Sequence, residues 1–195
     1  MKKIIAFTLA IIVSCGVFAA KRALIIGIGD YPSNSGWNKI NGDKDIPLVE
    51  EMLKANGFPT QNIVKLRNEQ ATFAGIKKEI ESLITKSQKD DIVYIHFSGH
   101  GQQITDLDGD EESGLDEAWI PYDAKFSYEK GKYEGQNHIV DDQLNRWLRQ
   151  IRTKIGSNGQ LIVVADACHS GGATRAEEDD SVVVRGTSDK FIIPA

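Results

Sequence analysis

Apolar residues gather in four short runs along the chain, at residues 22–28, 63–66, 91–97 and 161–165. Ile, Val, Leu and Ala dominate these runs, and glycine or polar residues follow them. Short apolar runs with such borders are typical of strands that are buried on both faces, as in a parallel sheet. The pattern therefore predicts four buried strands.

Between these runs, apolar residues recur three or four positions apart, over 43–55, 72–85 and 140–151. This spacing places them on one face of a helix. Strands that alternate with helices predict an α/β domain with a mostly parallel central sheet and helices on both faces. The polar segments in between are expected to form loops: 29–42, 106–116 and 125–137.

The first twenty residues differ from this pattern. Two lysines precede an apolar run at 4–13, and small residues follow at 16–20. This layout predicts a secretory signal peptide over residues 1–20, because the apolar run is too short to span a bilayer. A folded domain is then expected over residues 21–195. A buried N-terminal strand is the alternative interpretation of the leader.

Export through this leader could lead either to a released protein or to a lipid-anchored one. Cleavage after Ala19 or Ala20 would release a protein into the periplasm or the medium. Ser14-Cys15 loosely resembles a lipoprotein cleavage box, which would make Cys15 a lipid anchor. We favour ordinary secretion, since the first strand begins near Arg22 and leaves almost no tether between a lipid and the fold.

Composition and charge narrow the range of functions. The chain has 195 residues, 41% of them hydrophobic and 26% charged, which suits one globular domain. Loss of the leader removes two of the 23 basic residues and no acid, which leaves 21 basic against 28 acidic residues, a formal charge of −7. An acidic surface argues against nucleic-acid binding and fits basic substrates or cations.

Cysteine usage points to chemistry. The chain contains two cysteines, and Cys15 lies in the leader, so the mature protein would hold Cys168 as a single thiol. An exported protein exposes such a thiol to oxidants without a disulfide partner, which favours a functional role. A buried structural cysteine is the alternative.

Reactive side chains follow two of the predicted strands. His100 comes after the strand at 91–97, within Ser98-Gly99-His100-Gly101, and Cys168 comes after the strand at 161–165. Functional groups gather at the carboxyl ends of parallel strands, so we expect the two side chains to meet there. Cys168 would serve as nucleophile and His100 as its base, while the N–H groups of Gly101 and Cys168 would hold an oxyanion.

The same two segments carry a family resemblance. Residues 97–101 (FSGHG) and 166–171 (DACHSG) resemble the catalytic blocks of metacaspases, within the wider caspase-like peptidases, and 23–28 resembles their opening strand. The similarity extends from about residue 22 to 175. It implies a caspase-like three-layer α/β sandwich and a cysteine endopeptidase that works through a thioester. True caspases carry Gln where this chain has Asp166, which favours metacaspases.

Asp166 also bears on specificity. It lies two residues before Cys168 and points to the same side of an extended chain, where it can line the pocket for the residue before the scissile bond. The resemblance places Asp45 in that pocket as well. Two carboxylates would select Arg or Lys in a peptide substrate. An acid in the first turn of a helix is the structural alternative for Asp45.

Three other histidines have structural interpretations. His169 adjoins the nucleophile but points the opposite way along the chain, and His96 reads as a core or face residue of its strand. His138 lies in a polar segment without any motif. None of them is expected to act as the base.

Calcium is a possible activator, although the chemistry itself requires no cofactor. Residues 106–112 (DLDGDEE) begin like an EF-hand, but their glycine falls at the fourth position and no suitable Glu closes the loop. By resemblance, Asp116, Asp141 and Asp142 match three calcium ligands of metacaspases, and a fourth position falls near Arg175. Asp141 and Asp142 also suit the first turn of the following helix.

Two other functions fit the same residues. The first is a caspase-like pseudoenzyme that acts as a binding or regulatory module. Because related enzymes continue with further strands after the catalytic block, the domain at 21–195 is expected to lack the C-terminal strands of the full family. Either a partner chain supplies those strands, or the sequence is a fragment, or the protein is not an active protease. The second is a transpeptidase or amidase that uses the same Cys-His pair. For the peptidase, the polar stretches also offer basic residues at which the chain could cut itself: Lys125, Lys130, Lys132, Arg175 and Arg185.

Overall fold

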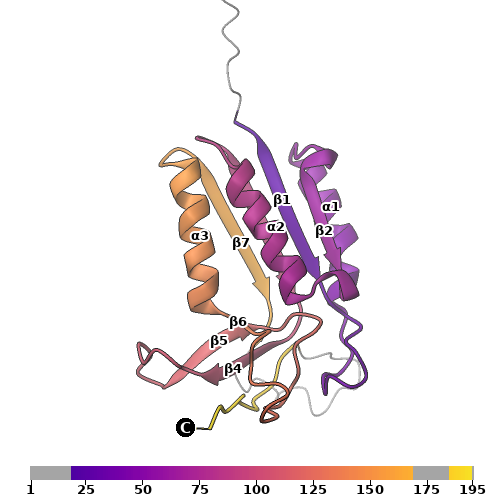
Figure 1. The fold of residues 1–195 in the computed structure, drawn as a ribbon. Helices are drawn as coiled ribbons and strands as arrows, with labels where there is room; N and C mark the ends of the chain where they lie inside the picture. Colours follow the sequence, from indigo (N-terminus) through magenta and orange to yellow (C-terminus); the bar gives the residue numbers. More distant parts are fainter. Residues whose placement is uncertain (1–18, 169–184, 195) are drawn as a thin grey trace, which may run out of the picture.

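The structure is a computed structural model that describes residues 19–168 and 185–194. A parallel sheet lies at its centre, with strand order β2-β1-β3-β7 in the described part of the chain (Figure 1). Its strands are β1 (Lys21–Gly27), β2 (Ile63–Arg67), β3 (Ile92–Ser98) and β7 (Gln160–Asp166). The four apolar runs in the sequence correspond to these strands, so the prediction of a mostly parallel sheet is confirmed.

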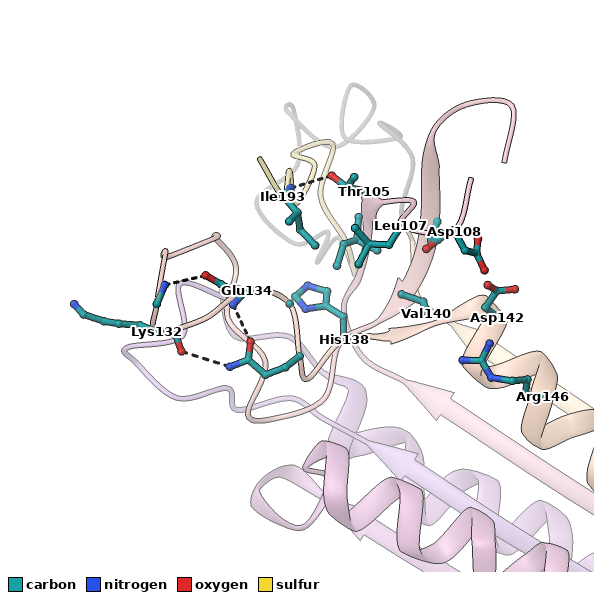
Figure 2. A pocket seen from close by; sticks show the side chains of 15 residues that line it. Thr105, Leu107, Asp108, Lys132, Glu134, His138, Val140, Asp142, Arg146 and Ile193 are labelled. Atoms are coloured by element: carbon teal, nitrogen blue, oxygen red, sulfur yellow. Dashed lines mark hydrogen bonds between the residues drawn. The ribbon is translucent and has the colours of Figure 1, made fainter. Parts of the chain in front are cut away.

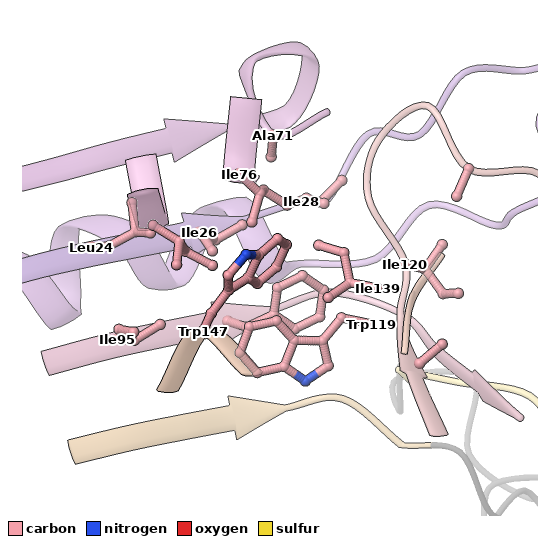
Figure 3. Packing of buried hydrophobic residues seen from close by; sticks show 14 of the residues in the cluster. Leu24, Ile26, Ile28, Ala71, Ile76, Ile95, Trp119, Ile120, Ile139 and Trp147 are labelled. Atoms are coloured by element: carbon pink, nitrogen blue, oxygen red, sulfur yellow. The ribbon is translucent and has the colours of Figure 1, made fainter. Parts of the chain in front are cut away.

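Helices cover both faces of this sheet. On one face, α1 (Asp45–Ala55) packs its Ile46 and Leu53 against β1. On the other face, α2 (Phe73–Lys86) and α3 (Asp141–Ile155) enclose the larger core. Trp147 of α3 lies within that core, beside apolar residues of the strands (Figure 3). This arrangement is the three-layer α/β sandwich that the sequence predicts.

Local sequence explains where the helices begin and end. The Thr72 hydroxyl accepts a hydrogen bond from the N–H of Gly75 at 3.1 Å and caps α2. Asp141 and Asp142 occupy the first turn of α3, where carboxylates favour the helix dipole. This helix continues to Ile155, four residues beyond the predicted end, and its last turn buries Ile151 and Ile155 in the core.

A second, antiparallel sheet was missing from the sequence-based prediction. It contains β4 (Gly101–Thr105), β5 (Leu115–Trp119) and β6 (Ile139–Val140), in the order β4-β5-β6. The loop expected at 106–116 therefore ends inside β5. Figure 1 shows this sheet beyond the carboxyl ends of the parallel strands, at the end of the molecule where the candidate residues gather.

The described C-terminal segment, residues 185–194, is fastened to β4. Phe191 is 1% exposed and lies in the larger core. Its N–H donates to the carbonyl of Gln103 at 2.8 Å, and its carbonyl accepts from the N–H of Thr105 at 3.0 Å. Backbone hydrogen bonds and the burial of Phe191 therefore fix this segment beside β4.

The β7 strand forms one border of the parallel sheet. Among the described residues it pairs with β3, and no strand lies on its other side. Ile162, Val163 and Val164 are 36–40% exposed, so the prediction that this run forms a buried strand is wrong: among the described residues nothing covers its outer side. Within the part of the chain that the structure describes, the sheet thus ends at an open, apolar edge.

Several predictions fall on residues outside the described ranges. They concern the signal peptide over most of its length, Cys15, His169 and Arg175. None of the helices in the described part of the chain is both long and apolar enough to cross a membrane.

Candidate active site

The strand register brings His100 and Cys168 to the same place. Ser98 at the end of β3 pairs with Asp166 at the end of β7, and the N–H of Gly99 donates to the carbonyl of Asp166 at 3.3 Å. His100 and Cys168 each lie two residues past this pair, so both follow the ends of neighbouring strands. The sequence argument from adjacent strand ends therefore has its basis in the pairing of β3 with β7.

The loop between β1 and α1 encloses His100. The Nε2 atom of His100 lies 2.9 Å from the carbonyl oxygen of Asn38, and its ring stacks on Trp37 with centroids 4.8 Å apart. The N–H of His100 donates to the Tyr31 hydroxyl at 3.0 Å, and that hydroxyl donates to the carbonyl of Ile120 at 2.9 Å. His100 is consequently only 3% exposed.

These contacts define the protonation state of the imidazole. A carbonyl oxygen can only accept a hydrogen bond, so Nε2 carries the proton and Nδ1 carries the free electron pair. Burial lowers the pKa of His100 below its ordinary value, and the bond to Asn38 offsets this effect only in part. The ring is therefore neutral at pH 7, with a basic Nδ1.

Nδ1 itself is buried and has no hydrogen-bond partner among the described residues. The structure thus places His100 and Cys168 close in the fold without a hydrogen bond between Nδ1 and the thiol. Such bonds often tighten only when substrate is bound, and the geometry of an empty site does not count against the pair.

The two backbone N–H groups expected to hold an oxyanion have different surroundings. Gly101 faces Trp119 across β4 and β5, and the N–H of Ile120 donates to the carbonyl of His100 at 3.1 Å. Gly101 and Trp119 therefore form a non-hydrogen-bonded pair of the antiparallel ladder. In such a pair the N–H groups point away from the partner strand, so the N–H of Gly101 is directed away from β5. The N–H of Cys168 donates to the carbonyl of Arg185 at 2.6 Å.

The two predicted pocket carboxylates lie around one guanidinium group. Asp45 Oδ2 accepts from the Ser98 hydroxyl at 2.6 Å and from Arg185 Nη1 at 2.5 Å. The same Nη1 also donates to Ser98 Oγ and to Asp166 Oδ2. Burial alone would raise the pKa of Asp45, but the bonds from Arg185 and Ser98 outweigh it and hold that pKa below its usual range.

Sequence reasoning did not identify several residues of this site. Tyr31, Trp37 and Asn38 lie in a segment read only as a loop, and Ser98 was noted only as a neighbour of His100. A buried aromatic pair in a polar loop was the available signal, because loops seldom bury large rings unless they cover something.

The other histidines have structural surroundings. His96 is 7% exposed on the α1 side of β3, and its ring lies parallel to that of Tyr94 with centroids 6.4 Å apart. His138 bonds through Nδ1 to the Tyr133 hydroxyl at 3.0 Å and through Nε2 to Gln102 at 3.1 Å. Burial lowers the pKa of His138 to about 4, so this ring stays neutral.

An acidic cluster lies beyond the antiparallel sheet. One ligand atom from each of Asp106, Asp110 and Asp116 falls within 4.8 Å of the others, and the same holds for Asp108, Asp110 and Asp142. Burial, followed by repulsion from these neighbours and from Asp141, raises the pKa of Asp116 to about 6. Asp116 and Asp142, two of the predicted calcium ligands, therefore lie close to acids of the 106–112 segment, which resembles the start of an EF-hand only in part.

Asp141, the third predicted ligand, belongs to neither group of three. Its Oδ1 accepts the N–H of Asp142 at 3.1 Å at the start of α3. A cavity of about 610 Å³ adjoins the acidic cluster, with Asp108, Asp142 and His138 in its lining (Figure 2). His100 and Cys168 do not line this cavity, so it is separate from the candidate active site.

Comparison with known proteins agrees with the two sequence blocks. The family model for the metacaspase, peptidase C14 domain, matches residues 21–176. Metacaspase-1A of Aspergillus fumigatus is 34% identical over 163 residues, and metacaspase-1 of Eremothecium gossypii is 31% identical over 161 residues. Each match covers 78% of this chain but only 35% and 32% of the relative, so the chain spans about a third of their length.

The solved structures add support for the fold. The crystal structure of protein GSU0716 from Geobacter sulfurreducens aligns with a TM-score of 0.64 and 24% sequence identity. The alignment covers 86% of this chain and 57% of that chain. At this identity the likeness establishes the arrangement of sheet and helices alone.

Proposed function

The chain belongs to the metacaspases of peptidase family C14, and on that premise we propose that it is a cysteine endopeptidase that cleaves after Arg or Lys. The observation that carries the proposal is the pair of carboxylates, Asp45 and Asp166, around one guanidinium group next to the candidate nucleophile. A pocket that binds an arginine of its own chain has the chemistry to bind a basic side chain of a substrate.

The proposed mechanism uses the groups in their observed places. The basic Nδ1 of His100 takes the proton of the Cys168 thiol, and the thiolate adds to the carbonyl carbon of the substrate. The N–H groups of Gly101 and Cys168 stabilise the oxyanion. Protonated His100 then releases its proton to the departing amine, and water hydrolyses the thioester. The Asn38 carbonyl holds the imidazole in one tautomer throughout.

Fluorogenic peptides that differ only in their last residue test this proposal. Wild-type protein should release the fluorophore after Arg or Lys at least about 100-fold faster than after Asp, since an acidic side chain would meet two carboxylates. Cys168→Ala should remove the activity. Steady-state kcat/KM for each peptide is the measurement.

Two outcomes would contradict the proposal. Equal hydrolysis of Arg and Asp peptides would exclude an acidic specificity pocket. Silence of the wild-type protein on all peptides, with binding still detectable by calorimetry, would favour the pseudoenzyme. Addition of an amine acceptor separates hydrolysis from transpeptidation, because only the latter yields a new amide product.

We also propose that the acidic cluster binds calcium as an activator. Carboxylate oxygens are the ligands that Ca²⁺ prefers, and Asp116 is buried among other acids at only 6% exposure. Asp106, Asp110 and Asp116 would hold the ion, and Asp142 belongs to the second group, which shares Asp110 with the first. The bound ion would neutralise the carboxylates and fasten the 106–114 loop to α3.

A further inference from the structure

The residue that precedes β1 is already bonded into the fold. The N–H of Ala20 donates to Oδ1 of Asp91 at 2.7 Å, and the carbonyl of Ala20 accepts the N–H of Ile92 at 2.9 Å. Ala19, one position earlier, is exposed. Among the described residues, the hydrogen bonds at this end of the chain therefore begin at Ala20, beside the predicted end of the leader.

Asp91 has the surroundings of a carboxylate that holds cations. It is 1% exposed, directly before β3. Its Oδ2 accepts from Arg22 Nε at 3.0 Å and from the N–H of Gln88 at 3.0 Å. Within the described part of the chain, its Oδ1 accepts from the neutral N–H of Ala20. Because a buried carboxylate is stabilised most by charged donors, Oδ1 is the oxygen at which a second cation would contribute most.

The leader allows cleavage after Ala19 or after Ala20, and two observations distinguish these positions. A leader peptidase requires small residues at the last and the third-last position before the cut. Cleavage after Ala19 puts Val17 at the third-last position, whereas cleavage after Ala20 puts the bulkier Phe18 there. Cleavage after Ala20 would also remove the residue that is bonded to Asp91 and to the start of β3. Both observations favour the bond between Ala19 and Ala20.

We propose that the Ala19–Ala20 bond is the processing site of this chain and that the ammonium group freed at Ala20 binds the buried carboxylate of Asp91. A leader peptidase of the exporting cell adds water across this peptide bond, which leaves a carboxylate on Ala19 and an ammonium group on Ala20. The ammonium nitrogen is the atom that already lies 2.7 Å from Asp91 Oδ1. Processing thus converts a neutral hydrogen bond into an ion pair without moving the chain. The inference rests on the predicted leader and is independent of the peptidase function.

The ion pair would fasten the start of β1 to the start of β3. Lys21 and Ile92 are the first paired residues of these two strands, and Ala20 and Asp91 directly precede them. New chain ends fray unless they are tied down. The ammonium group and Arg22 would each bind one oxygen of Asp91, so the end that processing creates would be held in place.

The mass of the exported protein locates the cut. A bacterial host that expresses the full chain with its own leader should export a protein that lacks residues 1–19 and begins at Ala20. Mass spectrometry of the intact, denatured protein gives this value. An exported protein that begins at Lys21 or at a lipid-modified Cys15, or that keeps its leader, would overturn the inference.

Acylation of the α-amine in the native exported protein tests the ion pair. Only the unprotonated amine reacts, and an ammonium group held by a carboxylate keeps its proton. Labelling at Ala20 should therefore be at least about tenfold faster in Asp91→Asn than in the wild type, since tenfold corresponds to one unit of pKa. The measurement is the labelled fraction of the N-terminal peptide over time, after digestion.

Arg22→Gln separates loss of the ion pair from general loosening of the strand, because it removes a neighbouring ion pair but keeps the carboxylate. Its α-amine should stay protected, as should that of Glu81→Gln, which changes an exposed acid of α2. Equal labelling of the wild type and Asp91→Asn would exclude the ion pair even in a chain that begins at Ala20. If Asp91→Asn does not fold, wild-type protein in urea replaces it: labelling no faster than in the native wild type would likewise overturn the inference.

Discussion

At the scale of single residues, His100, the proposed base, is oriented without a carboxylate. Its Nε2 is bound to the Asn38 carbonyl, a neutral acceptor, and its ring lies against Trp37 and Tyr31. A neutral acceptor fixes the tautomer but does little to stabilise an imidazolium ion. Because the enclosure also lowers the pKa of His100 below its ordinary value, the ring stays unprotonated at a lower pH than a free imidazole does.

The pH dependence of activity should reflect this enclosure. A base must be unprotonated, so kcat/KM should fall as the pH drops through the pKa of His100, at a pH below the ordinary 6.5. Trp37→Ala would let water reach the ring, which raises the pKa and moves the acidic limb to higher pH. We also expect a loss of roughly tenfold or more in kcat/KM at the optimum, from looser positioning of the base.

The measurement is kcat/KM for an Arg peptide across pH in the wild type and Trp37→Ala. Tyr94→Phe serves as a control, because Tyr94 is buried on the α1 side of the sheet beside His96 and away from His100. An acidic limb that stays in place in Trp37→Ala would show that burial by this ring does not set the pKa.

At the scale of elements, the connection between β4 and β5 carries the acidic cluster to the start of α3. Asp106 braces this loop, since its carboxylate accepts the N–H groups of Asp108 at 2.9 Å, Gly109 at 2.7 Å and Glu111 at 3.0 Å. The loop is therefore shaped by one acid while others face α3. Repulsion between the carboxylates of this cluster destabilises the folded loop unless a cation is bound.

Calcium should consequently stabilise the protein through Asp116. At 100 times its Kd a ligand adds about 2.7 kcal/mol, which for a chain of this size raises the Tm by roughly 5–10 °C. Asp116→Asn should lose this increase, yet it should raise the Tm of the calcium-free protein because one buried charge is removed. Glu51→Gln, an exposed acid of α1, is the control that should respond to calcium like the wild type.

Differential scanning calorimetry with calcium or with a chelator gives these values. An equal calcium response in the wild type and Asp116→Asn would place the ion elsewhere or exclude it. Mg²⁺ provides a second comparison, because it demands octahedral geometry and is bound less readily by a flexible cluster of acids.

The extent to which elements could be predicted depended on how much apolar sequence each one carries. The apolar runs at 22–28 and 91–97 predict β1 and β3 correctly because both faces of these strands are buried. By contrast, β4 reads GQQIT and β6 contains two residues, so neither shows a periodic signal. Their pairing arises from tertiary contacts that no local pattern encodes.

The residues of the candidate site also fall into two groups, those that the sequence could indicate and those that only the fold reveals. His100, which lies between Gly99 and Gly101, and Cys168 could be selected as candidates because each follows an apolar strand. Trp37 and Asn38 could not, since their position over His100 depends on the path of a loop. Arg185 was one basic residue among several, and only the fold places it between Asp45 and Asp166.

At the scale of the whole molecule, the outer edge of β7 is not paired with another strand among the described residues. Unpaired strand edges with apolar side chains invite pairing with another chain. Ile162 and Val164 lie on the face of β7 that corresponds to the α1 side of the sheet, where both remain exposed. We therefore expect two copies, or a copy and a partner strand, to join along this edge.

Sedimentation velocity over a range of concentrations should show self-association of the wild type. Ile162→Lys should reduce it, because a charged side chain on an edge strand opposes strand pairing. Leu48→Lys is the control, since Leu48 is 66% exposed on the outside of α1 and should not affect association. Equal association in both variants would locate the contact on another surface.

The strand order β2-β1-β3-β7 also has a consequence for the newly made polypeptide. The first strand lies inside the sheet, β2 and β3 add to its two sides, and the strand that leads to Cys168 is added last. Because Tyr31, Trp37 and Asn38, which enclose His100, all precede Cys168 in the sequence, the pocket around His100 can form before β7 and the candidate nucleophile are in place, wherever the chain folds. A chain in which β7 has not yet joined the sheet thus holds the candidate base without the candidate thiol, so the proposed activity would begin only when the sheet of the described residues is complete.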